Sequence, residues 1–248
     1  MIGRRLLRAE LRKLATTRMP LGFLAVLVAI AAINASAVIW GADADGSKTF
    51  ISTAADQRSL VAFASNAVII AGLFGAIAVA REYGHGTVIP TFLSSPRRVR
   101  AAAAQYGAVA IGGAILGIVG AALTVVAVAL ALPTTDFAFL ISTAGVLRVL
   151  AASAFAGGVG AVLGAGIGSV VRNVGGAVTG AVLVLFIAPP LVVQLARGTA
   201  SWMPSVLANV VSGVGRDVSP AAAIAAIAAW ALVPAAIGLI AVQRRDVV

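Results

Sequence analysis

The stretch from residue 101 to 132, AAAAQYGAVAIGGAILGIVGAALTVVAVALAL, decides the fold class. It contains no charged residue and is longer than the roughly 20 residues that an α-helix needs to cross the hydrocarbon core of a bilayer. No polar stretch that could form a water-exposed loop interrupts it. We therefore predict a transmembrane helix here, either tilted in the bilayer or extending beyond it.

The rest of the chain has the same character. Of its 248 residues, 61% are apolar and 10% are charged, and the mean hydropathy is +1.07. A soluble domain of this length could not hide so much apolar surface in one core, whereas a bilayer solvates it. The sequence predicts an all-α integral membrane protein, one domain over residues 1–248, with six transmembrane helices. The predicted spans are residues 20–40, 60–80, 101–132, 146–171, 174–195 and 221–242.

The basic residues are distributed unevenly along these spans. An even number of spans places both termini on one side, and that side holds 13 of the 18 lysines and arginines. The other side holds five basic and five acidic residues, so the whole excess charge of +10 lies on the first side. Loops rich in lysine and arginine remain in the cytoplasm. We predict a multi-pass protein of a bacterial inner membrane with both termini cytoplasmic, and we assign the charge to anionic lipid contacts rather than to nucleic acid.

The N-terminal residues 3–15 form an amphipathic pattern. Leucines at positions 6, 7, 11 and 14 recur near helical spacing, with arginines and a lysine between them. Such a segment is typical of a helix that lies in the membrane interface. Its basic part is too long, and the apolar run behind it too complete, for a cleaved signal peptide. We predict an amphipathic interfacial helix.

Several kinds of chemistry are disfavoured by composition. The chain has no cysteine and one histidine, which excludes thiolate metal sites and disfavours a histidine-based centre. Residues 41–48, GADADGSK, nearly match a phosphate-binding loop, but the serine precedes the lysine and no strand stands before them. A Gly- and Asp-rich external turn explains this segment better. We expect no enzyme activity and no cofactor in this chain, so that any ATP would be bound by a partner.

The spans carry few polar side chains and no carboxylate at mid-depth, which disfavours a proton- or sodium-coupled carrier. Asn66 and Gln194 could contact a polar part of a substrate, although hydrogen bonding between helices is the alternative interpretation. Glycines recur at four-residue spacing and favour close helix packing, within one bundle rather than between chains. These glycines are Gly113, Gly117, Gly160, Gly164, Gly168, Gly176 and Gly180.

The segment from Arg81 to Arg100, REYGHGTVIPTFLSSPRRVR, is the longest internal loop on the predicted cytoplasmic side. Gly84 and Gly86 should end the second span, and residues 87–93 can form a short helix across the membrane surface. A plain connection with basic anchors is the simpler interpretation. The variety of side chains in this segment favours a docking surface.

This loop resembles that of permeases of the type-2 ABC transporter family, the six-helix exporters. The resemblance rests on the patterns Glu82-Tyr83-x-x-Gly86-Thr87 and Leu93-Ser-x-Pro96-x-Arg98. The basic N-terminal segment, a Gly-rich fourth span ending in Arg172-Asn173, and Trp202-Met-Pro204 before the sixth span agree with it. The chain has no fused ATPase and no large external domain, and so resembles the minimal half-permeases.

The resemblance implies a function and a set of site residues. Residues 82–96 would form a loop with a cytoplasmic coupling helix that docks on a dimer of ABC ATPase subunits, and residues 196–219 an external re-entrant segment. A second permease chain, identical or related, would complete the transporter, whose cargo would be lipid-like or an amphiphilic drug, as in multidrug efflux. Trp202 joins Asn66 and Gln194 on the implied substrate path. The implied coupling residues are Glu82, Tyr83, His85, Gly86, Thr87, Thr91, Pro96, Arg97 and Arg98.

Three other functions remain open from the sequence. An importer subunit would require an external binding protein. A membrane scaffold without transport activity would not co-purify with an ATPase. A secondary carrier is disfavoured by the missing intramembrane carboxylate.

Overall fold

A computed structural model describes residues 2–43, 45–65, 67–88, 98–215 and 217–244. Six segments of this described chain form helices that are long and apolar enough to cross a membrane. The protein is therefore a multi-pass, all-α membrane protein, and the predicted fold class is confirmed. The six segments are Met19–Trp40, Ala54–Gly84, Arg98–Thr134, Thr143–Val171, Val174–Leu195 and Pro220–Arg244.

The first helix, α1 (Ile2–Thr16), is the amphipathic helix expected from the sequence. Its arginines Arg4, Arg8 and Arg12 are exposed, while Leu7 packs toward the third membrane helix at Gly107. The alternation of leucine and arginine thus gives the helix one face for the bundle and one face for water or headgroups. After a short bend the chain enters α2 (Met19–Trp40).

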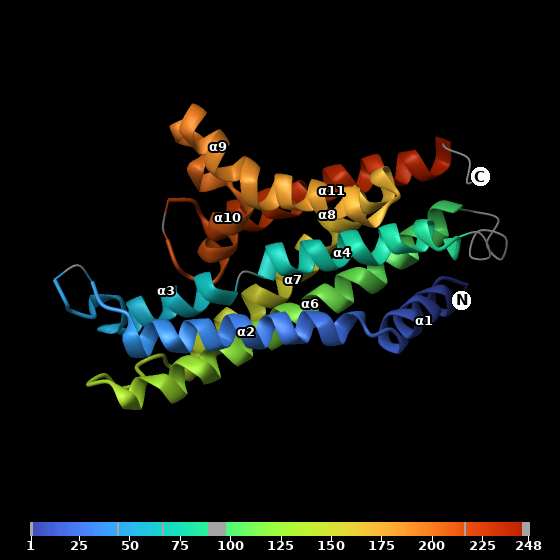
Figure 1. The fold of residues 1–248 in the computed structure, drawn as a ribbon. Coiled ribbons are helices and arrows are strands. Elements are labelled where there is room, and N and C mark those ends of the chain that lie inside the picture. Colours follow the sequence, from blue (N-terminus) through green and yellow to red (C-terminus); the bar gives the residue numbers. More distant parts are fainter. Residues whose placement is uncertain (1, 44, 66, 89–97, 216, 245–248) are drawn as a thin grey trace.

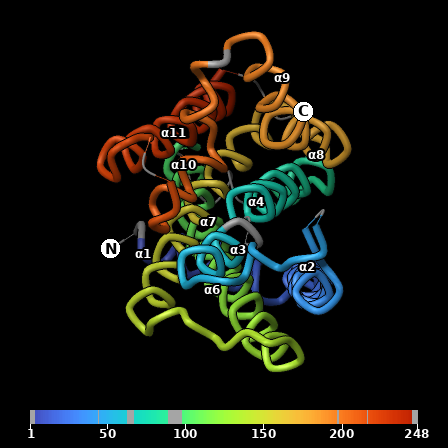
Figure 2. Tube along the Cα trace, turned by 90° about the vertical axis from the view of Figure 1, so that its left-hand side faces the viewer, coloured from blue at the N-terminus to red at the C-terminus, as the bar shows by residue number. Residues whose placement is uncertain are grey.

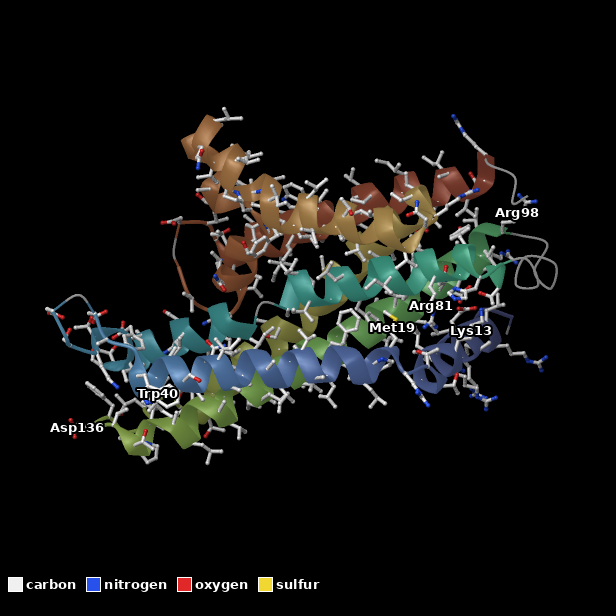
Figure 3. The ribbon with its side chains drawn as sticks, in the orientation of Figure 1. Lys13, Met19, Trp40, Arg81, Arg98 and Asp136 are labelled. Atoms are coloured by element: carbon white, nitrogen blue, oxygen red, sulfur yellow. The ribbon has the colours of Figure 1, made fainter. Side chains whose placement is uncertain are left out.

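The two ends of the bundle differ in what they hold. One end of the bundle holds the start of α1, the end of α4 (Ala67–Gly84), the start of α6 (Arg98–Ala131) and the end of α11 (Pro220–Arg244) (Figure 1). We call this the basal end. Lys13 and Arg81 lie there, whereas Trp40 lies at the opposite end, which we call the far end (Figure 3).

Helix α7 (Thr143–Val171) lies at the centre of the bundle, surrounded by α4, α6 and α11 (Pro220–Arg244) (Figure 2). Glycines let three neighbours approach its backbone. Gly164 meets α4 at Gly72, Gly157 meets α6 at Gly113, and Gly166 meets α11 at Pro234. The structure therefore assigns the glycine spacing in the fourth span to packing within one chain.

At the far end, the second span is made of two helices. Helix α3 (Ala54–Ser65) precedes α4, so this span begins six residues before the predicted position. The fully buried Gln57 on α3 fixes the loop that leads to α7. Its Nε2 donates to the carbonyl of Ala138 at 2.9 Å, and its Oε1 accepts the N–H of Leu140 at 2.8 Å. One amide side chain thus satisfies backbone groups of a loop more than 80 residues away.

The segment that nearly matched a phosphate-binding loop is a turn that caps α2. The ammonium of Lys48 donates to the carbonyls of Val38 and Ile39 at 3.0 and 2.6 Å. These carbonyls belong to the last turn of the helix, where acceptors lack helical donors. The carboxylate of Asp43 accepts the N–H of Thr49 at 2.8 Å and holds the turn closed.

The fifth span is interrupted, which the sequence analysis did not predict. Helix α8 (Val174–Val182) passes into a π-helical turn, η3 (Leu183–Ile187), before α9 (Ala188–Leu195). The N–H of Ala188 bonds the carbonyl of Leu183 across five residues. Pro189 and Pro190 follow at once and donate no N–H, so the regular helical ladder cannot continue there.

The chain then folds back along the last helix. The turn η4 (Arg197–Trp202) leads into the short helix α10 (Pro204–Val211), which packs against α11 (Figure 1). Leu207 of α10 and Ile227 of α11 are fully buried in one cluster. The indole N–H of Trp230 donates to the carbonyl of Trp202 at 3.0 Å and fixes the turn to α11.

Candidate functional site

The second span ends where the two glycines predict. Helix α4 ends at Gly84, and Gly86 has a φ of +68°, in the left-handed region that favours glycine. The N–H of His85 donates to the carbonyl of Arg81 at 3.0 Å, and that of Gly86 to the carbonyl of Tyr83 at 3.2 Å. These bonds satisfy carbonyls of the last turn, so the chain leaves the helix through a defined cap. Glu82 and Tyr83 therefore belong to the helix rather than to a loop.

Glu82 forms an ion pair with the N-terminal helix. The ammonium of Lys13 lies 3.3 Å from Oε1 of Glu82 and 2.7 Å from Oε1 of Glu10, a residue that is only 6% exposed. Partial burial lowers the pKa of Lys13, but the hydrogen bond to Glu10 and the charge of Glu82 outweigh it and raise this pKa above its ordinary value. One lysine thus pairs with two carboxylates and ties α1 to α4.

Tyr83 faces the other side of the same helix end. The guanidinium carbon of Arg172 lies 5.1 Å from the centroid of the Tyr83 ring, a cation–π contact. Nη2 of Arg172 also donates to the carbonyl of Ala241 near the end of α11, at 3.1 Å. Arg172 stands at the C-terminal cap of α7 with a φ of +61°. It therefore connects α4, α7 and α11 at one point.

A buried hydrogen bond adds α6 to this group. The hydroxyl of Tyr106 donates to Oγ of Ser169 at 2.8 Å, and both residues are buried. We call the set Glu10, Lys13, Glu82, Tyr83, Tyr106, Ser169 and Arg172 the basal cluster. Through it the foot of α4 is linked to α1, α7 and α11, and α7 is linked to α6.

The other predicted coupling residues have different positions. His85 and Thr87 are exposed, and Arg98 opens α6. The hydroxyl of Thr87 donates to the carbonyl of Glu82 at 3.3 Å, so it also supports the helix end. Among residues 82–88, the described part of the predicted coupling loop, the side chains of His85 and Thr87 are exposed, while those of Glu82 and Tyr83 turn inward. Thr91, Pro96, Arg97 and most of the predicted coupling helix lie outside the described residues.

The structure describes two of the three predicted substrate-path residues. Asn66 lies outside the described residues, Gln194 is exposed on α9, and Trp202 is 47% exposed at the end of η4. Among the described residues, no hydrogen bond or ring contact joins the side chains of Gln194 and Trp202. The same described ranges hold no cluster of three histidine, aspartate or glutamate side chains that could bind a metal.

Sequence reasoning missed part of the basal cluster. The spacing Glu10-x-x-Lys13 places two charges on one helix face and could have indicated an ion pair. Nothing in the sequence singles out Ser169 or Tyr106, because their contact joins positions 63 residues apart. Their role depends on the packing of α6 against α7.

No known family has a sequence profile that matches this chain, and comparison with curated proteins finds no significant match.

Proposed function

We propose that this chain is the permease subunit of an ATP-driven exporter of the type-2 ABC kind. Two permease chains pair in the bacterial inner membrane, and a dimer of separate ATPase subunits docks on the basal end, which faces the cytoplasm. ATP is bound and hydrolysed by these partners and not by the permease. The cargo is an amphiphilic, lipid-like or drug-like molecule.

The basal cluster is the observation that carries this proposal. A permease driven by a separate ATPase needs a place where a push on the surface moves several helices together. The foot of α4, directly before the segment that resembles a coupling helix, is linked through Lys13 to α1 and through Arg172 to α7 and α11. Helices that are joined by ion pairs and hydrogen bonds transmit a displacement to one another better than helices without such contacts.

Within this arrangement the residues have distinct roles. His85 and Thr87 are exposed and available to a docked ATPase. Glu82 and Tyr83 act inside the permease and pass the movement of that surface to neighbouring helices. Many of the buried residues at the contacts between helices are glycine or alanine. Such small residues let the helices shift against one another with small steric cost.

The proposed topology can be tested directly because the chain has no cysteine. We expect an introduced cysteine at exposed Asp45 to react with a membrane-impermeant maleimide in intact cells, and one at exposed Arg244 to react only after permeabilisation. The cysteine-free parent gives the background. Labelling of Arg244→Cys and protection of Asp45→Cys in intact cells would show the opposite orientation. The basal end would then face outward, where no cytoplasmic ATPase could dock.

The transport function needs a reconstituted test. The chain should be purified with an ABC ATPase that co-purifies with it and placed in liposomes that contain a fluorescent amphiphilic cation. We expect ATP-dependent movement of the dye with the intact pair, and none with either protein alone or with an ATPase that cannot hydrolyse ATP. Hydrolysis of ATP by the permease alone, or dye movement that does not depend on ATP, would contradict the proposal.

A further inference from the structure

A cavity of about 200 Å³ lies in the far half of the bundle, between α4, α7, η3 and α10. Its walls are mostly apolar, with Val68, Ala156 and Phe186 among them. Ser153 of α7 is the tenth residue after Thr143, which places it about 15 Å along that helix. The cavity is therefore at membrane depth and not in an external loop.

Among the described lining residues, four carry uncharged polar side chains: Ser153, Ser205, Asn209 and Ser212. The hydroxyl of Ser212 donates to the backbone carbonyl of Asn209 at 2.7 Å and keeps its lone pairs as acceptors. Within the described residues, the side-chain amide of Asn209 makes no hydrogen bond. Asn209 is half-buried, so its amide can bond to water or to a ligand that enters the cavity.

The π-helical turn leaves one residue of the cavity wall with a backbone carbonyl that has no helical donor. Leu185 lines the cavity, and the residues four and five positions after it are Pro189 and Pro190. Neither proline has an N–H, so the Leu185 carbonyl has neither an α-helical nor a π-helical donor. Backbone that departs from regular helix at membrane depth is tolerated where it is buried in protein or lines a cavity.

The size and charge of the cavity limit what can occupy it. None of the described residues that line it is charged, so an ion would lose its hydration without gaining a counter-charge from them. A dry protein cavity of about 150 Å³ holds one benzene molecule. The present cavity is somewhat larger and polar on one side. It therefore suits a single ring or a short chain that carries one hydroxyl or amide group.

Asn209 also lines a second pocket, of about 400 Å³, which lies between α3 and α10. The other residues of this pocket include Phe50, Asp56 and Val214, all near the far end. Asn209 is thus common to the described linings of both pockets. A molecule that passes from the second pocket into the inner cavity would meet this side chain.

We propose that the inner cavity is a binding site for a small, uncharged amphiphile, which enters past Asn209 and hydrogen-bonds to its amide. The site belongs to a single chain. It needs neither the ATPase nor a second permease, and so does not rest on the proposed transport function.

Fluorine NMR on the purified full chain in nanodiscs tests this site with three probes that share a fluorophenyl ring, of which the two neutral ones are equal in size. These are 4-fluorophenol, 4-fluorotoluene and 4-fluorobenzoate, which differ in the group opposite fluorine: hydroxyl, methyl or carboxylate. Empty nanodiscs give the signal from partition into lipid. We expect saturable binding of 4-fluorophenol above that signal, weaker binding of 4-fluorotoluene, and none of 4-fluorobenzoate.

Variants locate the binding. Ala208→Phe fills the cavity and should abolish saturable binding, whereas Val206→Phe, on the same helix but not in the lining, should leave it within twofold of the parent. Asn209→Leu keeps the size of the side chain and should weaken 4-fluorophenol binding about tenfold without weakening 4-fluorotoluene. Ser205→Leu provides a second filled cavity if Ala208→Phe does not give a monodisperse protein.

The proposal is overturned if the parent shows no saturable 4-fluorophenol binding, or if the monodisperse filled variant binds as well as the parent. It is also overturned if Asn209→Leu weakens both neutral probes equally, because the amide would then not be recognising the hydroxyl. None of these outcomes bears on ATP-driven transport, which the liposome experiment tests separately.

Discussion

Gly164→Leu is expected to lower the thermal unfolding midpoint of the purified protein by roughly 6–12 °C. A Cβ at position 164 would lie 2.8 Å from the backbone nitrogen of Ala76 and the carbonyl carbon of Gly72. Backbone atoms of α4 cannot move aside as a side-chain end can, so α7 and α4 must separate. Overpacking a core costs about 1–3 kcal/mol and sometimes more, and about 3 kcal/mol corresponds to a shift of roughly 6–12 °C for a chain of this size.

The matched control for this variant is Gly22→Leu. Gly22 also lies in a membrane helix, but a Cβ there would meet no atom within 4 Å. Its midpoint should stay within about 2 °C of the parent. Equal loss of stability in both variants, measured in the same detergent, would mean that glycine at position 164 is not required by the contact between α7 and α4.

Lys13→Glu is expected to destabilise the protein by about 1–3 kcal/mol and to uncouple transport from ATP hydrolysis. The substitution removes the cation between Glu10 and Glu82 and places three carboxylates together. A hydrogen bond to a charged group contributes about 1.5–3 kcal/mol, and the 40% exposure of the Lys13 side chain reduces that figure through solvent screening. The loss should appear in the unfolding midpoint of the chain alone and in dye transport by the complete assembly.

Two further variants identify the ion pair as the cause. Adding Glu82→Lys to Lys13→Glu restores a cation between two carboxylates and should recover at least half of the lost stability, as a double-mutant cycle measures. Arg12→Glu makes the same charge change at an exposed neighbour and should have little effect. If the double variant is no more stable than Lys13→Glu, the contact between α1 and α4 does not depend on this pair.

Two alanine substitutions at the foot of α4 distinguish a role in coupling from a role in folding. Glu82→Ala and Tyr83→Ala should reduce transport and the cargo-stimulated activity of the ATPase together, while the protein stays monodisperse. Both residues lie at the end of α4 and remain partly exposed, so truncation leaves no closed cavity in the apolar core. Normal transport by both variants, or cross-linking of the ATPase to another basal segment, would move the coupling site elsewhere.

The fold class could be predicted from the amino-acid sequence alone. Runs of apolar residues longer than a bilayer thickness, such as residues 101–132, have one stable arrangement in lipid, because every backbone group must be bonded within its own helix. The amphipathic helix before the first span followed in the same way from the spacing of its leucines and arginines. Hydropathy and helical periodicity are local properties, and they can be read along the chain without knowledge of its partners.

Tertiary structure decided how these helices meet and which side chains act together. Glycine spacing indicated close packing, but only the fold shows that Gly157, Gly164 and Gly166 face three different helices. The ion pair between Glu82 and Lys13 joins positions 69 residues apart, and no local sequence pattern predicts such a pairing. The prolines after η3 were visible in the sequence, yet the cavity beside them exists because α10 folds back against α11. Contacts between distant segments arise when separately formed helices pack, and for that reason only the folded chain reveals them.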